Sequence, residues 1–346
     1  MPENTGKEQL IPQKGKNFEN RTMKSFKNIL SQLLKAIIAV GLIWLIIKRT
    51  GFTFNEFVDI MRGINLWLYL LALPGVLIVL WLKSRRWHYL MKTEGIHYDT
   101  TNTYKSYLTS YSIGLLTPGR FGEIVRVYYI RDLSEGGLFK AFQTVIADRF
   151  FDLYFVLGGG LLSYALLLQT ENITFLWISV MIVIFGLLIL WVLLYCFRNK
   201  NQKHNFISFL YGSLYPITGI HSMKNWLLTV FAYMIYFLQS YLIAKALNFH
   251  IGFWEMAGVI IITSAVLLIP ITWAGFGTRE LSLVVLLAHW GISSESAMAF
   301  SLLQFVATFF IGGITGLVIW FSHPIPREAL KKDYESIKQF LKFRKN

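Results

Sequence analysis

The sequence of 346 residues is 55% hydrophobic and only 15% charged, and its mean hydropathy is +0.50. Soluble domains carry about 25% charged residues, so this composition excludes an ordinary soluble protein and indicates an integral membrane protein. The formal net charge is +14, but the basic residues lie in short segments between apolar runs, which argues against a nucleic-acid partner.

The apolar runs predict an all-α membrane fold. A basic leader at residues 1–28 precedes six runs of about 20 residues, the length that crosses a bilayer as a helix. These predicted spans are residues 29–47, 64–82, 150–169, 174–197, 226–247 and 296–321. Two further apolar regions, 104–130 and 255–290, are interrupted by glycine-rich motifs. We expect each to form a broken helical hairpin, either re-entrant or crossing in two halves, which makes about eight membrane segments before a basic amphipathic tail at 322–346.

Lysine and arginine predict the orientation, because short cytoplasmic loops are enriched in both. Six of these residues lie in the leader, and Lys83, Arg85, Arg86 and Lys92 follow the second predicted span. Segments 170–173, 248–254 and 291–295 contain none. We therefore expect a multi-pass protein of the plasma or inner membrane with both termini in the cytoplasm. The first hairpin would then enter from the cytoplasmic side and the second from outside.

The order span, span, hairpin, span occurs twice, at residues 29–169 and 174–321, with opposite orientation. This pattern predicts an inverted-topology repeat. Glycines at 158–160 in the third span and at 312, 313 and 316 in the sixth occupy similar positions, where small residues let helices approach closely. The alternative is that glycine is simply commoner in membrane helices.

The first motif, Thr117-Pro-Gly-Arg-Phe-Gly-Glu123, breaks a helix at membrane depth. Backbone groups freed in this way are tolerated only where protein or a water-filled cavity receives them. A helix beginning at Glu123 would offer its free amides to an anion, and two nearby arginines could bind a lipid phosphodiester. The candidate head-group residues are Thr117, Gly119, Arg120, Gly122, Glu123 and Arg126. The alternative is an ion-pair cluster that only ties the hairpin together.

The second motif, at residues 270–280, repeats this logic. Gly275 and Gly277 form the break, and Arg279 and Glu280 open the next helix. A third cluster comprises Asp148, Arg149 and Asp152. Its two aspartates, four residues apart, share a helix face, where they could pair with Arg120, Arg126 or Arg149, or carry protons. The alternative for this cluster is a set of interfacial charges.

The motifs T-P-G-R-F-G-E at 117–123, D-R-F-F-D at 148–152 and G-F-G-T-R-E at 275–280 resemble those of the lysylphosphatidylglycerol synthase transmembrane (flippase-like) family. The resemblance implies a membrane domain that moves aminoacylated phosphatidylglycerol between leaflets. In full-length enzymes of that family a separate cytoplasmic domain attaches the lysine. The tail here is too short for such a domain, so we expect no lysyltransferase activity.

The leading hypothesis is a membrane lipid translocase rather than an enzyme, moving an anionic or aminoacylated phospholipid or a polyprenyl-phosphate-linked lipid. No phosphate-loop motif is present, and with Cys196 as the single cysteine we expect no cofactor and no metal. The alternative is a membrane-embedded transferase, or an accessory subunit of a lipid-modifying enzyme, with Asp148 or Glu123 as the base. A structural scaffold is a third hypothesis. The expected partner is the lipid itself, and a homodimer or a separate lipid-modifying enzyme stays open.

Overall fold

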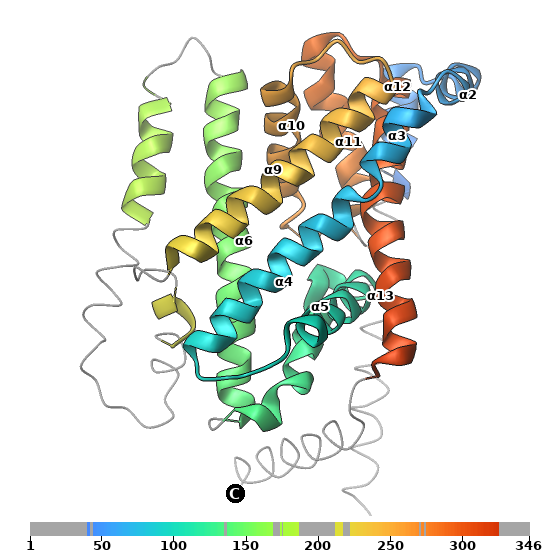
Figure 1. Cartoon of the computed structure of the whole chain (residues 1–346). Coiled ribbons are helices and arrows are strands. Elements are labelled where there is room, and N and C mark those ends of the chain that lie inside the picture. Colours follow the sequence, from blue (N-terminus) through green and yellow to red (C-terminus); the bar gives the residue numbers. More distant parts are fainter. Residues whose placement is uncertain are drawn as a thin grey trace, which may run out of the picture.

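The computed structural model is shown in Figure 1, and every regular element in its described part is helical. The described residues are 40–41, 44–134, 137–168, 174, 176–186, 212–216, 222–269, 271–272 and 275–324. The predictions for the leader, for most of the first span, for the end of the fourth and for nearly all of the tail lie outside these residues. The division into two repeats stays a prediction.

Four helices in the described part of the chain are long and apolar enough to cross a membrane. They are Leu66–Thr93, Gly137–Leu168 (α6), Ser222–Ala246 (α9) and Ser294–Ser322. The first consists of α3 (Leu66–Ala72) and α4 (Gly75–Thr93), and the last of α12 (Ser294–Phe305), the π-helical turn η5 (Val306–Phe310) and α13 (Ile311–Ser322). Four predicted spans are thereby confirmed, namely 64–82, 150–169, 226–247 and 296–321.

Two of these helices are longer than the sequence predicted. α4 continues past residue 82 to Thr93, and α6 begins at Gly137 rather than at residue 150. The predicted boundaries fall at charged residues such as Lys83 and Asp148, because a hydropathy profile treats every charge as exposed to water. In the fold both side chains form ion pairs inside the helical bundle, so the helices continue through them.

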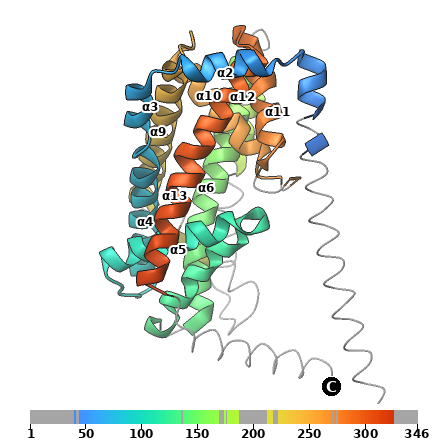
Figure 2. The same cartoon turned by 90° about the vertical axis from the view of Figure 1, so that its right-hand side faces the viewer.

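Shorter elements connect the long helices and include both motif regions. They are α2 (Phe54–Arg62), α5 (Thr100–Leu115), the 3-10 helices η1 (Pro118–Tyr129) and η2 (Arg131–Leu133), the apolar helix Leu176–Gly186, α10 (Phe253–Val266), α11 (Thr278–Leu287) and η4 (Ala288–Trp290). Figure 2 shows α5 in the lower half of the bundle and α11 in the upper half. The two interrupted regions therefore lie toward opposite ends of the bundle.

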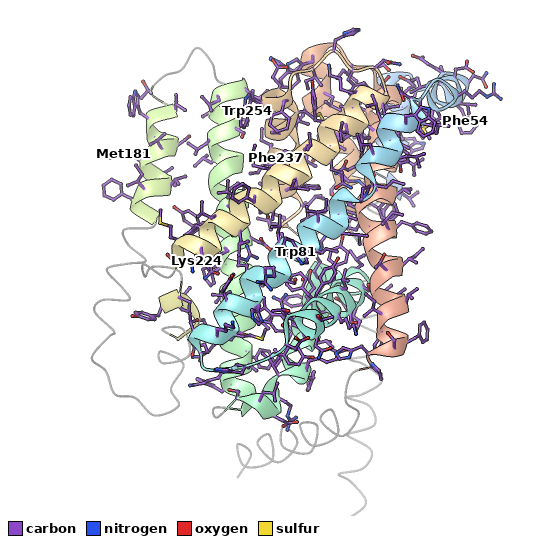
Figure 3. All side chains as sticks on the ribbon, viewed as in Figure 1. Phe54, Trp81, Met181, Lys224, Phe237 and Trp254 are labelled. Atoms are coloured by element: carbon purple, nitrogen blue, oxygen red, sulfur yellow. The ribbon has the colours of Figure 1, made fainter. Side chains whose placement is uncertain are left out.

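Large apolar side chains cover the outside of the bundle. Trp81 on α4, Met181 on the helix Leu176–Gly186 and Trp254 on α10 are 49%, 48% and 71% exposed and are labelled in Figure 3. Phe237 on α9, by contrast, belongs to the core. An apolar outer surface of this extent is unusual for a water-soluble monomer and suits contact with lipid chains.

Helices of the first half of the chain pack against helices of the second half. α4 packs against α9, α6 packs against α10, and α5 packs against α13 (Figure 1). The glycines mark these contacts: a methyl group on Gly160 of α6 would lie 2.9 Å from Cβ of Ala265. On α13, a methyl group on Gly316 would overlap Ser112 Oγ and the carbonyl oxygen of Leu108. Each glycine cluster thus packs on the motif helix of the other half.

Replacing Gly316 with alanine should lower the free energy of unfolding by about 1–3 kcal/mol, the usual cost of overpacking a close contact. The obstacle is a backbone carbonyl of α5, which cannot rotate away as a flexible side chain can. Reversible unfolding in mixed micelles measures the change. Gly41→Ala is the control, because no atom of the described residues lies within 4 Å of a methyl group at Gly41. Equal stability of the two variants would contradict the prediction.

Candidate functional site

A cavity of about 520 Å³ lies between the two motifs. Thr117, Arg120 and Glu123 from the first motif line it, together with Gly275 and Arg279 from the second. Side chains of α4, α6, α9 and α12 complete the wall. Among the described lining residues four are cationic and two are acidic: Lys83, Arg120, Arg149, Arg279, Glu123 and Asp152. The chamber therefore favours an anion.

The first motif forms a tight turn followed by a 3-10 helix. The backbone N–H of Gly122 donates to Thr117 Oγ1 at 2.7 Å. Gly122 has no room for a side chain, because a methyl group there would lie 2.5 Å from the carbonyl oxygen of Ile113. The helical segment η1 begins at Pro118 and includes Gly119, whereas the sequence predicted a helix starting at Glu123. The helix thus begins five residues before Glu123, and the amide of Gly122 is used by Thr117. The anion site stays a prediction.

Arg120 occupies a strained position in this turn. Its φ of 57° lies in the left-handed region, which costs a non-glycine residue about 1–2 kcal/mol. Its guanidinium carbon lies 5.4 Å from the ring centre of Tyr111 and 5.1 Å from that of Phe309. The side chain is 43% exposed, and its nearest carboxylate oxygen, on Glu123, is 3.9 Å away. Arg120 is thus held at the cavity by rings and is only loosely ion-paired.

The second motif also turns through left-handed positions, at Gly275 (φ 79°) and Gly277 (φ 83°). The N–H of Gly277 donates to Glu280 Oε2 at 2.6 Å, which caps α11 where the sequence predicted a helix start. Arg279 Nη2 donates to Glu280 Oε1 at 2.5 Å, and Arg279 Nε donates to Ser301 Oγ at 2.8 Å. Arg279 Nη1 has no hydrogen-bond partner among the described residues. The N–H donors of Nη1 on this buried guanidinium are therefore unused among the described residues.

Phe309 brings the two motifs together. The guanidinium carbon of Arg279 lies 5.9 Å from its ring centre, so one aromatic ring is within 6 Å of both motif arginines. Phe309 belongs to the π-helical turn η5, a geometry found frequently at functional sites. Phe309 is not among the site residues predicted from the sequence, because nothing in the sequence pattern distinguishes it from the other 27 phenylalanines.

A fully buried ion-pair cluster lies behind the cavity wall. Asp148 accepts hydrogen bonds from Arg126 Nη2 at 2.6 Å, from Arg86 Nε at 2.8 Å and from the hydroxyl of Tyr107 at 3.2 Å. The guanidinium of Arg126 also contacts the rings of Trp87 and Tyr107. The predicted pairing of Asp148 with Arg126 is confirmed, but neither residue lines the cavity. Arg126 lies behind the wall, and its Nε and Nη1 have no hydrogen-bond partner among the described residues. Its head-group role stays a prediction.

The remaining charges of the third cluster face the cavity. Asp152 Oδ1 accepts from Lys83 Nζ and from Arg86 Nη1, each at 3.0 Å. Arg149 forms an ion pair with Glu123, which ties α6 to the first motif. Lys83 and Arg86 were predicted to follow the second membrane span, whereas α4 continues through both to Thr93. Their spacing of three residues, which places both on one helix face, was the available signal.

The predicted site residues thus separate into two groups. Thr117, Arg120, Glu123, Arg149, Asp152, Gly275 and Arg279 meet at the cavity. Five others shape or support it from outside the lining: Gly122, Arg126, Asp148, Gly277 and Glu280. Gly119 belongs to η1.

Residues 32–316 match the protein family described as the lysylphosphatidylglycerol synthase TM region. The chain belongs to this family. A UPF0104 membrane protein of Methanocaldococcus jannaschii is 25% identical over 313 residues, which cover 80% of this chain and 90% of that protein. The protein is accordingly a multi-pass membrane protein, and the predicted family resemblance is confirmed. No solved structure matches the chain.

Proposed function

We propose that this protein is a lipid translocase that moves an anionic or aminoacylated phospholipid, or a polyprenyl-phosphate-linked lipid, between leaflets. One observation carries the proposal: arginines from two broken helices, located toward opposite ends of the bundle, meet at Phe309 in a single cavity. The phosphate of the head group would bind between Arg120 and Arg279. Guanidinium groups suit this role because they offer paired donors to phosphate oxygens.

The energetics of transport support this assignment. A charge crossing hydrocarbon is opposed by about 3 kcal/mol or more. The excess of cationic groups in the cavity lowers this barrier for a phosphate. Arg120 is held in a strained backbone conformation, and such strain is concentrated at functional sites.

The packing of helices from one half of the chain against helices of the other supports an inverted repeat. A twofold axis through the α4–α9 contact would relate the α5–α13 pair to the α10–α6 pair. In this proposal one half rocks against the other around a fixed site, as in other transporters built from inverted repeats. The orientation is the one that the lysine and arginine distribution predicts. Both termini lie in the cytoplasm, and the first hairpin faces that side.

The test is leaflet-resolved transport in proteoliposomes that contain a fluorescent anionic phospholipid. Arg120→Ala should slow transport about 30-fold, the equivalent of losing one charge-assisted phosphate contact of about 2 kcal/mol. Arg62→Ala on α2 is the matched control, because Arg62 is 79% exposed and does not line the cavity. An unchanged rate for correctly folded Arg120→Ala would refute the assigned role.

The transferase alternative requires a free carboxylate as base. Asp148 is fully buried between Arg86 and Arg126, and Glu123 is paired with Arg149. Asp148 can accept a proton from a substrate only after losing a partner. Glu123 lines the cavity and its Oε1 has no hydrogen-bond partner among the described residues, so Glu123 is the base that this alternative would use. Formation of a covalent product from a labelled donor by the purified protein would favour the transferase instead.

A further inference from the structure

Two buried glutamines form part of the cavity wall. Gln239 on α9 and Gln304 on α12 are 1% and 3% exposed, and both line the cavity. Gln239 Nε2 donates to the carbonyl oxygen of Ala307 at 3.3 Å, and Gln304 Nε2 donates to Ser240 Oγ at 3.0 Å. The side-chain oxygens of both glutamines have no partner in the described part of the chain.

The neighbours fix how these amides are turned. A backbone carbonyl such as that of Ala307 can only accept, so it must face the NH₂ group of Gln239. The hydroxyl proton of Ser240 is used by the carbonyl oxygen of Tyr236, at 2.9 Å, so Ser240 accepts from Gln304. Both glutamine oxygens are therefore the unpaired atoms, and a buried acceptor without a donor is unfavourable.

Gln304 lies near the motif arginine of the second half, and Gln239 lies elsewhere on the same cavity wall. Ser301, which accepts from Arg279 Nε, precedes Gln304 by three residues on α12, so the two side chains are neighbours on one helix face. Gln239 packs its side chain against Gly75 at the crossing of α4 and α9. A molecule with its phosphate at Arg279 would place its head group within reach of this part of the wall.

We propose that Gln239 and Gln304 form a second subsite that accepts hydrogen bonds from hydroxyl groups of the lipid head group. This inference rests on the proposed function, because the arginines hold the phosphate of the same molecule. The substrate class is then a lipid phosphodiester with a polyol or sugar head group.

Charge disfavours an ammonium head group at this subsite, so this inference narrows the substrates of the proposed function to lipids without an aminoacyl group. The two carboxylates that line the cavity, Glu123 and Asp152, are already paired with cations. Glu123 Oε1 also lacks a hydrogen-bond partner in the described part of the chain, but Arg120 Nη1 lies 3.9 Å from it. The two amides are neutral and do not offset the cost of removing an ammonium from water. The cationic excess of the cavity also repels a positive head group.

The test compares phosphatidylglycerol with phosphatidylmethanol in the proteoliposome assay. The two head groups share the phosphodiester charge and differ in their hydroxyl groups. The wild-type protein should transport phosphatidylglycerol about tenfold faster, the gain expected from two neutral hydrogen bonds. Gln239→Met and Gln304→Met keep the length of the side chain without the amide, and each should reduce the preference, with the double variant falling to within about twofold of unity.

The matched control is Asn225→Leu. Asn225 is also a buried amide on α9 with an unpaired oxygen, but it does not line the cavity, so the preference should persist. Equal wild-type rates for the two lipids, or a phosphatidylethanolamine rate equal to that of phosphatidylglycerol, would overturn the subsite while leaving the translocase intact. Failure of the wild-type protein to move any of these lipids, and also an aminoacylated phosphatidylglycerol and a polyprenyl-phosphate-linked lipid, would overturn both proposals. If the methionine variants do not fold, the ratio of the wild-type transport rates for phosphatidylglycerol and phosphatidylmethanol still tests the subsite.

Discussion

Replacing Asp148 with asparagine is expected to lower the free energy of unfolding by about 3–5 kcal/mol, the range for removing one partner of a buried ion pair. Arg86 and Arg126 both donate to Asp148, and all three side chains are fully buried. Arg86 keeps Asp152 as a second partner, whereas Arg126 has no other acidic partner among the described residues. The variant leaves the Arg126 charge uncompensated inside the bundle.

Reversible unfolding in mixed micelles measures this effect. Asp59→Asn is the control, since Asp59 is 73% exposed and pairs with Arg62 at 3.6 Å. Its effect should stay within about 0.5 kcal/mol, as for other exposed pairs. Adding Arg126→Met to Asp148→Asn should restore part of the lost stability, because the orphaned charge is then gone. A loss below about 1 kcal/mol for Asp148→Asn would show that the pair does not hold the wall together.

The sequence was sufficient to predict four of the six apolar spans and both helix breaks, because each depends on local composition. The length of an apolar run matches the thickness of the bilayer. Glycines such as Gly275 and Gly277 indicate positive-φ backbone conformations that other residues avoid. The start of α11 was found for the same reason, since Glu280 lies three residues after the cap. Predictions of this kind need no knowledge of which helices are neighbours.

The pairing of Asp148 with Arg126 was predicted, but the place of Arg86 in the same buried cluster was not, because its partners come from distant parts of the chain. Arg86 and Asp148 are 62 positions apart and meet only when α4 packs on α6. A charge at the end of an apolar run looks like a loop residue, so Arg86 was taken as a topology signal. The same limit hid the different roles of Arg120 and Arg126, which belong to one motif but lie on the cavity and behind its wall.

Combining Arg120→Ala with Arg279→Gln is expected to slow transport about 100-fold, less than the roughly 900-fold that two independent 30-fold losses would produce. If both guanidinium groups hold one phosphate, replacing either one already weakens most of the contact with that phosphate. The second substitution then reduces the transport rate by a smaller factor. The coupling is about 1.3 kcal/mol. Glutamine is used at Arg279 because its amide can still donate to Glu280 or Ser301, which Arg279 contacts.

The rates come from the proteoliposome assay, with unfolding measured for each variant so that only folded protein is compared. A control cycle of Arg120→Ala with Arg62→Ala should be additive, because Arg62 does not line the cavity. Additive losses for Arg120 and Arg279 would indicate two separate contacts rather than one bound phosphate. The ring of Phe309 lies within 6 Å of both guanidinium carbons and could couple them without any ligand. The cycle is therefore repeated with Phe309→Leu, and coupling that persists without the ring must pass through the lipid phosphate.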